Sequence, residues 1–170
     1  MLVTMDDKPA PLPASPTHIA QELPRLIERM HRRYLDVVRI ELSRVGIFDI
    51  SPVQAVMLGT IGEEEISVRD LIERGYYLGS NASYNLKNMV DGGYVERQAS
   101  VRDRRSARLK LSVKGHHILA LLMKLNGQMA ESLIKNEEHG LEATSRTLHY
   151  LERRWTEAIR SESPSDDADF

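Results

Sequence analysis

Residues 92–113 read GGYVERQASVRDRRSARLKLSV, and their pattern is the most informative in the chain about its fold class. The segments 94–99 and 107–113 are predicted to be short strands, and the charged segment 101–105 joins them. Between Tyr94 and Lys110, six cations and two anions give a net charge of +4. Five of the cations are arginines, whose planar guanidinium suits phosphate or a narrow minor groove of DNA. The sequence therefore predicts a basic β-hairpin.

Three helices are predicted before this hairpin. Residues 51–54 (Ser-Pro-Val-Gln) form a capping box with proline at the first helical position, so a helix begins there. Residues 67–75 begin with a serine cap and an acid three residues later, which indicates a second, short helix. A third helix runs from Ser80 or Asn81 to Asp91, where two glycines end it. Three helices followed by a hairpin predict a winged helix-turn-helix, so the fold class is mainly α with a small β-hairpin.

The third helix has two different faces. Ala82, Leu86, Met89 and Val90 share an apolar face. The opposite face is polar and supplies the candidate DNA-recognition residues Ser80, Asn81, Tyr84, Lys87 and Asn88. Asparagine amides can pair with adenine edges in the major groove. Alone, this face is typical of an ordinary solvated helix, but next to the basic hairpin it favours DNA contact.

Long helices are predicted on both sides of the winged unit and are expected to build a homodimer. Helical periodicity runs over 17–45, with a bend expected at Pro24, and again from Ser112 to Ile159 with a break near 136–140. The C-terminal helices carry more apolar side chains than one small wing domain can cover. These are Ile118, Leu122, Leu125, Met129, Leu148, Leu151, Trp155 and Ile159.

The 170 residues are long enough for one substantial core. We divide them into a disordered proline-containing leader (1–16), an N-terminal dimerisation or linking helix (17–50), the winged helix-turn-helix DNA-binding domain (51–112), C-terminal dimerisation helices (113–160) and an acidic disordered tail (161–170). No signal peptide or membrane span is readable, so a cytoplasmic location without membrane partners is expected.

Several chemistries are excluded or disfavoured. The chain contains no cysteine, which removes disulfides, thiolate metal sites and thiol nucleophiles. No glycine-flanked nucleophile, P-loop or dinucleotide fingerprint occurs, so neither an enzyme nor a cofactor is expected. His116 and His117 are adjacent and point about 100° apart on a helix, so they cannot act as paired ligands. No metal site is predicted, although a cluster of histidines distant in sequence stays open.

The stretch from Ser51 to Leu119 resembles the multiple-antibiotic-resistance regulator (MarR) family. The resemblance is carried by Ser51-Pro52-Val53-Gln54, Gly93-Tyr94-Val95-Glu96-Arg97, Asp103-Arg104-Arg105-Ser106 and Leu111-Ser112-Val113-Lys114-Gly115. It implies a homodimeric winged-helix regulator of a near-palindromic operator, released by a small effector. The candidate wing residues are Arg102, Asp103, Arg104 and Arg105 at the charged tip. The resemblance implies that Arg105 enters the minor groove while Asp103 orients it by a salt bridge. Residues 76–81 depart from the family pattern, so the operator sequence does not carry over.

The resulting prediction is a homodimeric, sequence-specific DNA-binding regulator, with repression preferred over activation. Its expected partners are double-stranded DNA, a second copy of the chain and a small aromatic or phenolic effector. The candidate effector-binding residues are His31, Tyr34, Val38, Phe48 and Met57, each of which could equally be plain core packing. The alternative is a winged-helix protein-interaction module whose basic hairpin binds an acidic partner.

Overall fold

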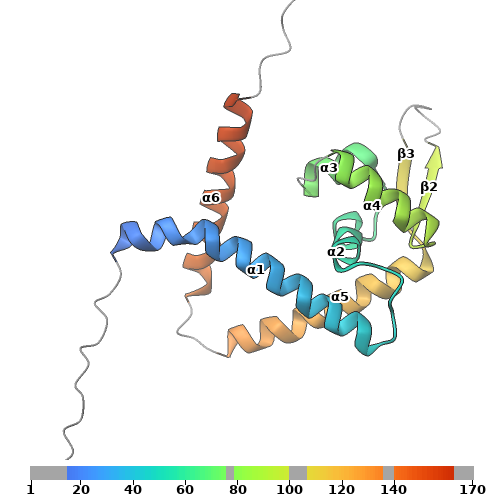
Figure 1. The fold of residues 1–170 in the computed structure, drawn as a ribbon, viewed down its shortest axis with the longest axis horizontal. Helices are drawn as coiled ribbons and strands as arrows, with labels where there is room; N and C mark the ends of the chain where they lie inside the picture. The colour runs from blue at the N-terminus through green and yellow to red at the C-terminus, as the bar shows by residue number, and fades with distance from the viewer. Residues whose placement is uncertain (1–14, 76–78, 100–106, 136–139, 163–170) are drawn as a thin grey trace, which may run out of the picture. The chain divides into compact units, whose positions relative to one another are not determined.

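The computed structural model describes residues 15–75, 79–99, 107–135 and 140–162. Along the chain the elements are α1 (Pro16–Arg44), α2 (Pro52–Ile61), β1 (Ile66–Ser67), α3 (Val68–Gly75), α4 (Gly79–Asp91), β2 (Val95–Ala99), β3 (Ala107–Leu111), α5 (Val113–Ile134) and α6 (Leu141–Glu162) (Figure 1). The chain divides into two compact units: residues 1–123, which we call the winged unit, and residues 124–170. The predicted mainly helical winged fold is confirmed. No helix in the described ranges has an apolar stretch long enough to cross a lipid bilayer.

The predicted starts of α2 and α3 are confirmed by their capping contacts, whereas α4 begins at Gly79, before the predicted caps Ser80 and Asn81. The backbone N–H of Gln54 donates to Ser51 Oγ at 3.2 Å, and the N–H of Ser51 donates to Gln54 Oε1 at 3.0 Å. At α3, Ser67 Oγ accepts from the N–H of Asp70, whose carboxylate in turn accepts from the Ser67 N–H. Both patterns satisfy helix N–H groups that have no partner within the helix. Pro24 lies inside α1, which continues through it.

The sheet has three strands where the sequence predicted only a hairpin. The antiparallel order is β1-β3-β2, and β1 pairs Ile66 with Leu109 and Ser67 with Arg108. A strand of two residues is too short to show a period, so the pattern could not reveal it. The strands are also shorter than predicted, because Ser112 and Val113 belong to the start of α5.

The core of the first unit lies between the helices and the sheet. Its fully buried large side chains are Val38, Met57, Leu58, Ile61, Ile66, Leu71, Met89, Tyr94, Leu109 and Ile118. The prediction that Ile118, Leu122 and Leu125 belong to the surface covered by a dimer is wrong, because all three side chains are already buried in the single chain. Met129, Leu148, Trp155 and Ile159 are exposed. The apolar surface left for a partner is therefore smaller than the sequence suggested.

Candidate nucleic-acid interface

The two faces of α4 are separated as the sequence predicted. Ala82, Leu86 and Met89 are buried against the rest of the winged unit, where α4 contacts α2 and β2 (Figure 1). On the other side, Ser80, Asn81, Tyr84 and Lys87 are exposed and Asn88 is half-buried. The buried stripe fixes the rotation of the helix about its axis, and so determines which side chains face solvent.

Most polar side chains on this outer face keep their hydrogen-bonding capacity. No hydrogen bond joins the side chains of Ser80, Asn81, Tyr84 or Asn88 to any described residue. Lys87 is different, because its ammonium contacts Asp91 Oδ2 at 2.6 Å. Solvent-facing hydroxyl and amide groups on one helix face are the groups that read base edges and contact phosphates.

The described part of the hairpin is basic on its exposed positions. Arg108 and Lys110 of β3 lie opposite Gln98 and Glu96 of β2, and all four side chains are exposed. With Arg97, three cations and one anion leave a net charge of +2 on these strands. The tip that carries Arg102, Asp103, Arg104 and Arg105 lies outside the described residues, so the predicted wing contacts stay predictions.

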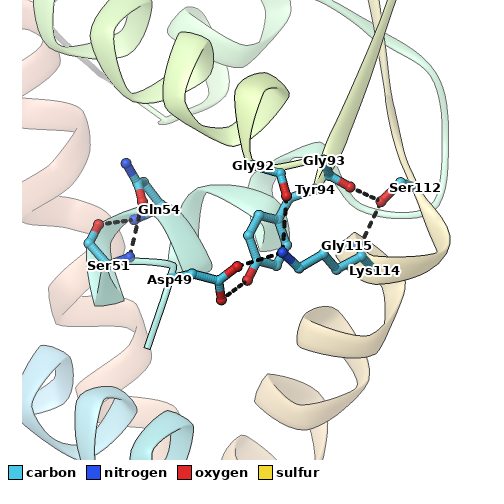
Figure 2. Close-up of polar contacts among 9 residues, drawn as sticks. All are labelled: Asp49, Ser51, Gln54, Gly92, Gly93, Tyr94, Ser112, Lys114 and Gly115. Atoms are coloured by element: carbon cyan, nitrogen blue, oxygen red, sulfur yellow. Dashed lines mark hydrogen bonds and ion pairs between the residues drawn. The ribbon is translucent and has the colours of Figure 1, made fainter. Parts of the chain in front are cut away.

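A cluster of three side chains ties the end of α4 to other elements of the unit (Figure 2). Lys114 Nζ donates to Asp49 Oδ2 at 2.6 Å and to the carbonyl of Gly92 at 3.0 Å. The hydroxyl of Tyr94 donates to Asp49 Oδ1 at 2.6 Å, and Lys114 Nζ lies 4.0 Å from the centre of the Tyr94 ring. The Asp49–Tyr94–Lys114 cluster therefore joins the α1–α2 loop, the turn after α4 and the first turn of α5.

Ser112 completes this junction. Its Oγ donates to the carbonyl of Gly93 at 2.6 Å and accepts from the N–H of Gly115 at 3.1 Å (Figure 2). Its own N–H donates to the carbonyl of Tyr94 at 3.0 Å. Gly93 has a φ of 73°, a conformation that glycine adopts without steric cost. The turn after α4 is thus hydrogen-bonded directly to the start of α5.

Sequence reasoning missed the structural role of these residues. The Ser112-Val113-Lys114-Gly115 segment served only as a mark of family resemblance. A serine at a helix start, followed three residues later by glycine, is a local signal that could have indicated a cap and a close backbone approach. Asp49 is 65 residues from Lys114 in the sequence, so no local pattern connects them.

The cluster shifts the pKa values of its members. Hydrogen bonds from Lys114 and Tyr94 lower the pKa of Asp49. The hydrogen bond to Asp49 raises the pKa of Lys114. Burial is the main cause that raises the pKa of the Tyr94 hydroxyl, and its bond to Asp49 adds to this. The charged forms of Asp49 and Lys114 are therefore the forms that the folded chain favours.

We expect Asp49→Asn to lower the free energy of unfolding by no more than about 1 kcal/mol at pH 7, because both ion-pair partners are largely exposed. The folded pKa of Asp49 lies below its ordinary value of 3.8, so its contribution is complete above that value and declines as the pH falls through the folded pKa. Urea unfolding at pH 7 and pH 3 measures this, and the difference between wild type and variant should shrink at pH 3. Glu64→Gln, at an exposed loop position, serves as control. An undiminished difference at pH 3 would contradict the ionic role.

The predicted effector residues lie in different environments. Val38 and Met57 are fully buried, Tyr34 is half-buried, and His31 and Phe48 are exposed, with Phe48 at 79%. Two cavities of about 270 Å³ are lined by other side chains, one along α1 and one between α4 and β2. The effector site stays a prediction. Among the described residues, no three histidine or carboxylate side chains gather in a way that could hold a metal ion.

A helical unit closed by a three-stranded antiparallel sheet, with a polar helix face beside basic strands, defines a winged helix-turn-helix protein. Residues 48–106 match the model of the MarR family. The chain is 45% identical over 141 residues to the exopolysaccharide II synthesis transcriptional activator ExpG of Rhizobium meliloti (strain 1021), covering 82% of this chain and 73% of that protein. The chain therefore belongs to the MarR family of transcriptional regulators.

Solved structures share the fold. FabT of Streptococcus pneumoniae in complex with DNA has a TM-score of 0.65 at 22% identity, covering 82% of this chain and 99% of that chain. A mutant MarR of E. coli complexed with operator DNA has a TM-score of 0.60 at 23% identity, covering 83% and 98%. The transcriptional regulator BldR of Sulfolobus solfataricus has a TM-score of 0.65 at 18% identity, covering 82% and 99%.

Proposed function

We propose that this chain is a homodimeric, sequence-specific transcriptional regulator. In this proposal α4 enters the major groove of operator DNA and the β2–β3 hairpin reaches the adjacent minor groove. The main support for this proposal is the outer face of α4, where hydroxyl and amide groups face solvent beside basic strands. A neutral, hydrogen-bonding helix reads bases, whereas cationic strands contact phosphates without reading sequence. The two α4 helices of a dimer would then lie about one DNA turn, roughly 34 Å, apart.

The homodimer is supported by the apolar pattern of α6. Leu141, Leu148 and Trp155 recur every seven residues and are each between 41% and 43% exposed. Leu151 lies three residues after Leu148 and continues the same stripe. An exposed heptad stripe is the pattern with which helices pair. A second copy of the chain is the proposed partner of this face.

The regulator could act either as a repressor or as an activator of transcription. The sequence analysis prefers a repressor controlled by a small aromatic or phenolic effector. The relative with 45% identity is named an activator, which supports the opposite sign. Transcription from the chain's own upstream promoter, measured with and without the chain, decides between them. A rise on its removal indicates repression, and a fall indicates activation.

DNA binding is tested with variants that separate positioning contacts from base contacts. Arg105→Ala should weaken binding to all duplexes and reduce the slope of log K against log salt by about 2, because one contact is lost per protomer. Asn81→Ala should cost about 1–3 kcal/mol on the operator while changing the slope and non-specific binding little. Asp103→Ala should weaken operator binding in part, since Arg105 loses its orientation. Fluorescence anisotropy with the upstream promoter fragment, at several salt concentrations, measures all three.

Lys135→Ala removes an exposed cation at the end of α5 and is the control for net charge. It should leave both affinity and slope unchanged within error. Unchanged binding by Arg105→Ala would contradict the role of the hairpin, and tighter operator binding by Asp103→Ala would contradict the orienting salt bridge. No measurable binding to the promoter fragment or to other duplexes would favour the protein-interaction alternative.

A further inference from the structure

A groove of about 270 Å³ lies between α4 and β2 in the winged unit. Val68 from the start of α3 lies at one side, and α4 supplies most of the other lining residues. The lining side chains are Val68, Ser83, Leu86, Lys87, Val90, Asp91 and Arg97. Among the described residues that line the groove, Lys87 and Arg97 are the cations, and they come from two different elements. The described lining of the groove thus combines two cationic side chains from different elements with the carboxylate of Asp91.

The pairing of the strands explains why Arg97 belongs to this groove. Arg97 lies opposite Leu109 in the β2–β3 ladder, and Leu109 is fully buried beneath the helices. The side chains of two paired residues project from the same face of a sheet, so the side chain of Arg97 projects from the face that packs against the helices. The side chains of its neighbours Glu96 and Gln98 project from the other face of the sheet, where they pair with Lys110 and Arg108. Arg97 is exposed and has no ion pair with any described residue.

The ion pair between Lys87 and Asp91 adds little to the stability of α4. Asp91 is the last residue of the helix, where the helix dipole disfavours an anion. A base placed four residues before an acid is also the weaker order for such a pair. Nevertheless Lys87 Nζ lies 2.6 Å from Asp91 Oδ2, and this contact raises the pKa of Lys87. The carboxylate of Asp91 therefore forms an ion pair with the ammonium of Lys87, which faces the proposed DNA-binding surface.

We propose that this groove seats a DNA phosphate between Lys87 and Arg97, and that Asp91 holds Lys87 in the free protein and so limits DNA affinity. The inference rests on the proposed function. A duplex that places its major groove on α4 and its minor groove on the hairpin carries a sugar-phosphate strand between these elements, over the groove. On binding, Lys87 exchanges the carboxylate of Asp91 for the phosphate.

The test is a double-mutant cycle on DNA affinity. Asp91→Asn keeps the shape of the side chain but removes the competing charge, so binding should tighten by about three- to tenfold for the dimer at moderate salt. Lys87→Ala and Arg97→Ala should each weaken binding and reduce the salt slope by about 2. Asp91→Asn added to Lys87→Ala should give no further gain, because its effect passes through Lys87. The probes are the upstream promoter fragment and a 30-base-pair duplex of arbitrary sequence.

The matched control is Asp36→Asn on α1. Asp36 also pairs with a nearby arginine, Arg39, and its substitution changes the net charge by the same amount. It should leave DNA affinity unchanged within about twofold, which is less than a local competing charge produces. Equal tightening by Asp36→Asn, or equal tightening by Asp91→Asn with and without Lys87, would overturn the inference in favour of a general charge effect.

Different DNA-binding results would overturn the role of Asp91 and the proposed function. If the wild-type chain binds neither duplex, the proposed function fails. If it binds the promoter fragment but Asp91→Asn binds no more tightly, only the role of Asp91 fails. If Arg97→Ala leaves the salt slope unchanged while Lys87→Ala reduces it, the proposal that both cations bind the phosphate is wrong.

Discussion

Gly115→Ala is expected to destabilise the winged unit by about 3 kcal/mol, because an added methyl group has no room there. A Cβ on Gly115 would lie 2.2 Å from the carbonyl oxygen of Tyr94 and 3.3 Å from Leu111 Cβ. The carbonyl cannot move away without breaking its hydrogen bond to the N–H of Ser112. The start of α5 must then separate from the turn after α4. Urea unfolding followed by circular dichroism measures the loss.

Gly59→Ala is the matched control for this prediction. Gly59 lies inside α2 in the same unit, and a Cβ there would meet no atom within 4 Å. Alanine is favoured over glycine inside a helix by about 0.5–1 kcal/mol, so this variant should be more stable than wild type. The two glycine substitutions therefore have opposite expected signs. A Gly115→Ala protein as stable as wild type would show that α5 does not approach the Tyr94 carbonyl so closely.

Replacing Leu148 and Trp155 together with glutamate is expected to abolish the proposed homodimer. The two side chains lie seven residues apart on the apolar stripe of α6, and carboxylates in a paired stripe would be buried without partners. Operator affinity should fall at least about 100-fold, because a single half-site offers little contact area. Light scattering at micromolar concentration gives the oligomeric state, and anisotropy gives the affinity.

The control is the double variant Arg146→Ala, Arg153→Ala. These arginines are exposed, also lie seven residues apart on α6, and their loss lowers the net charge by the same two units. They lie on the opposite side of the helix from Leu148 and Trp155, since two residues correspond to about 200° of rotation. This variant should remain dimeric. A dimeric Leu148→Glu, Trp155→Glu protein would contradict the proposed role of the stripe, as would a monomeric wild type.

The features that could be predicted from the amino-acid sequence are those that depend on residues close together in the chain. Ser51 with Gln54, and Ser67 with Asp70, specify helix starts through hydrogen bonds that span three residues. The spacing of Tyr84 and Leu86 along α4 specifies its exposed and buried faces, because two residues correspond to about 200° of helical rotation. These local rules sufficed to predict the order of helices and hairpin and the polar face of α4.

The features that join residues distant in the sequence became apparent only in the folded chain. Ile66 becomes a strand residue because Leu109 is there to pair with it, and Lys114 meets Asp49 across 65 positions. Arg97 counted in the sequence only as one cation of a basic hairpin, yet its pairing with Leu109 directs it towards Asp91 and α4. Hydrogen bonds and ion pairs of this kind require chain segments to be brought together by burial of the core, and no short-range pattern records which residues will then meet.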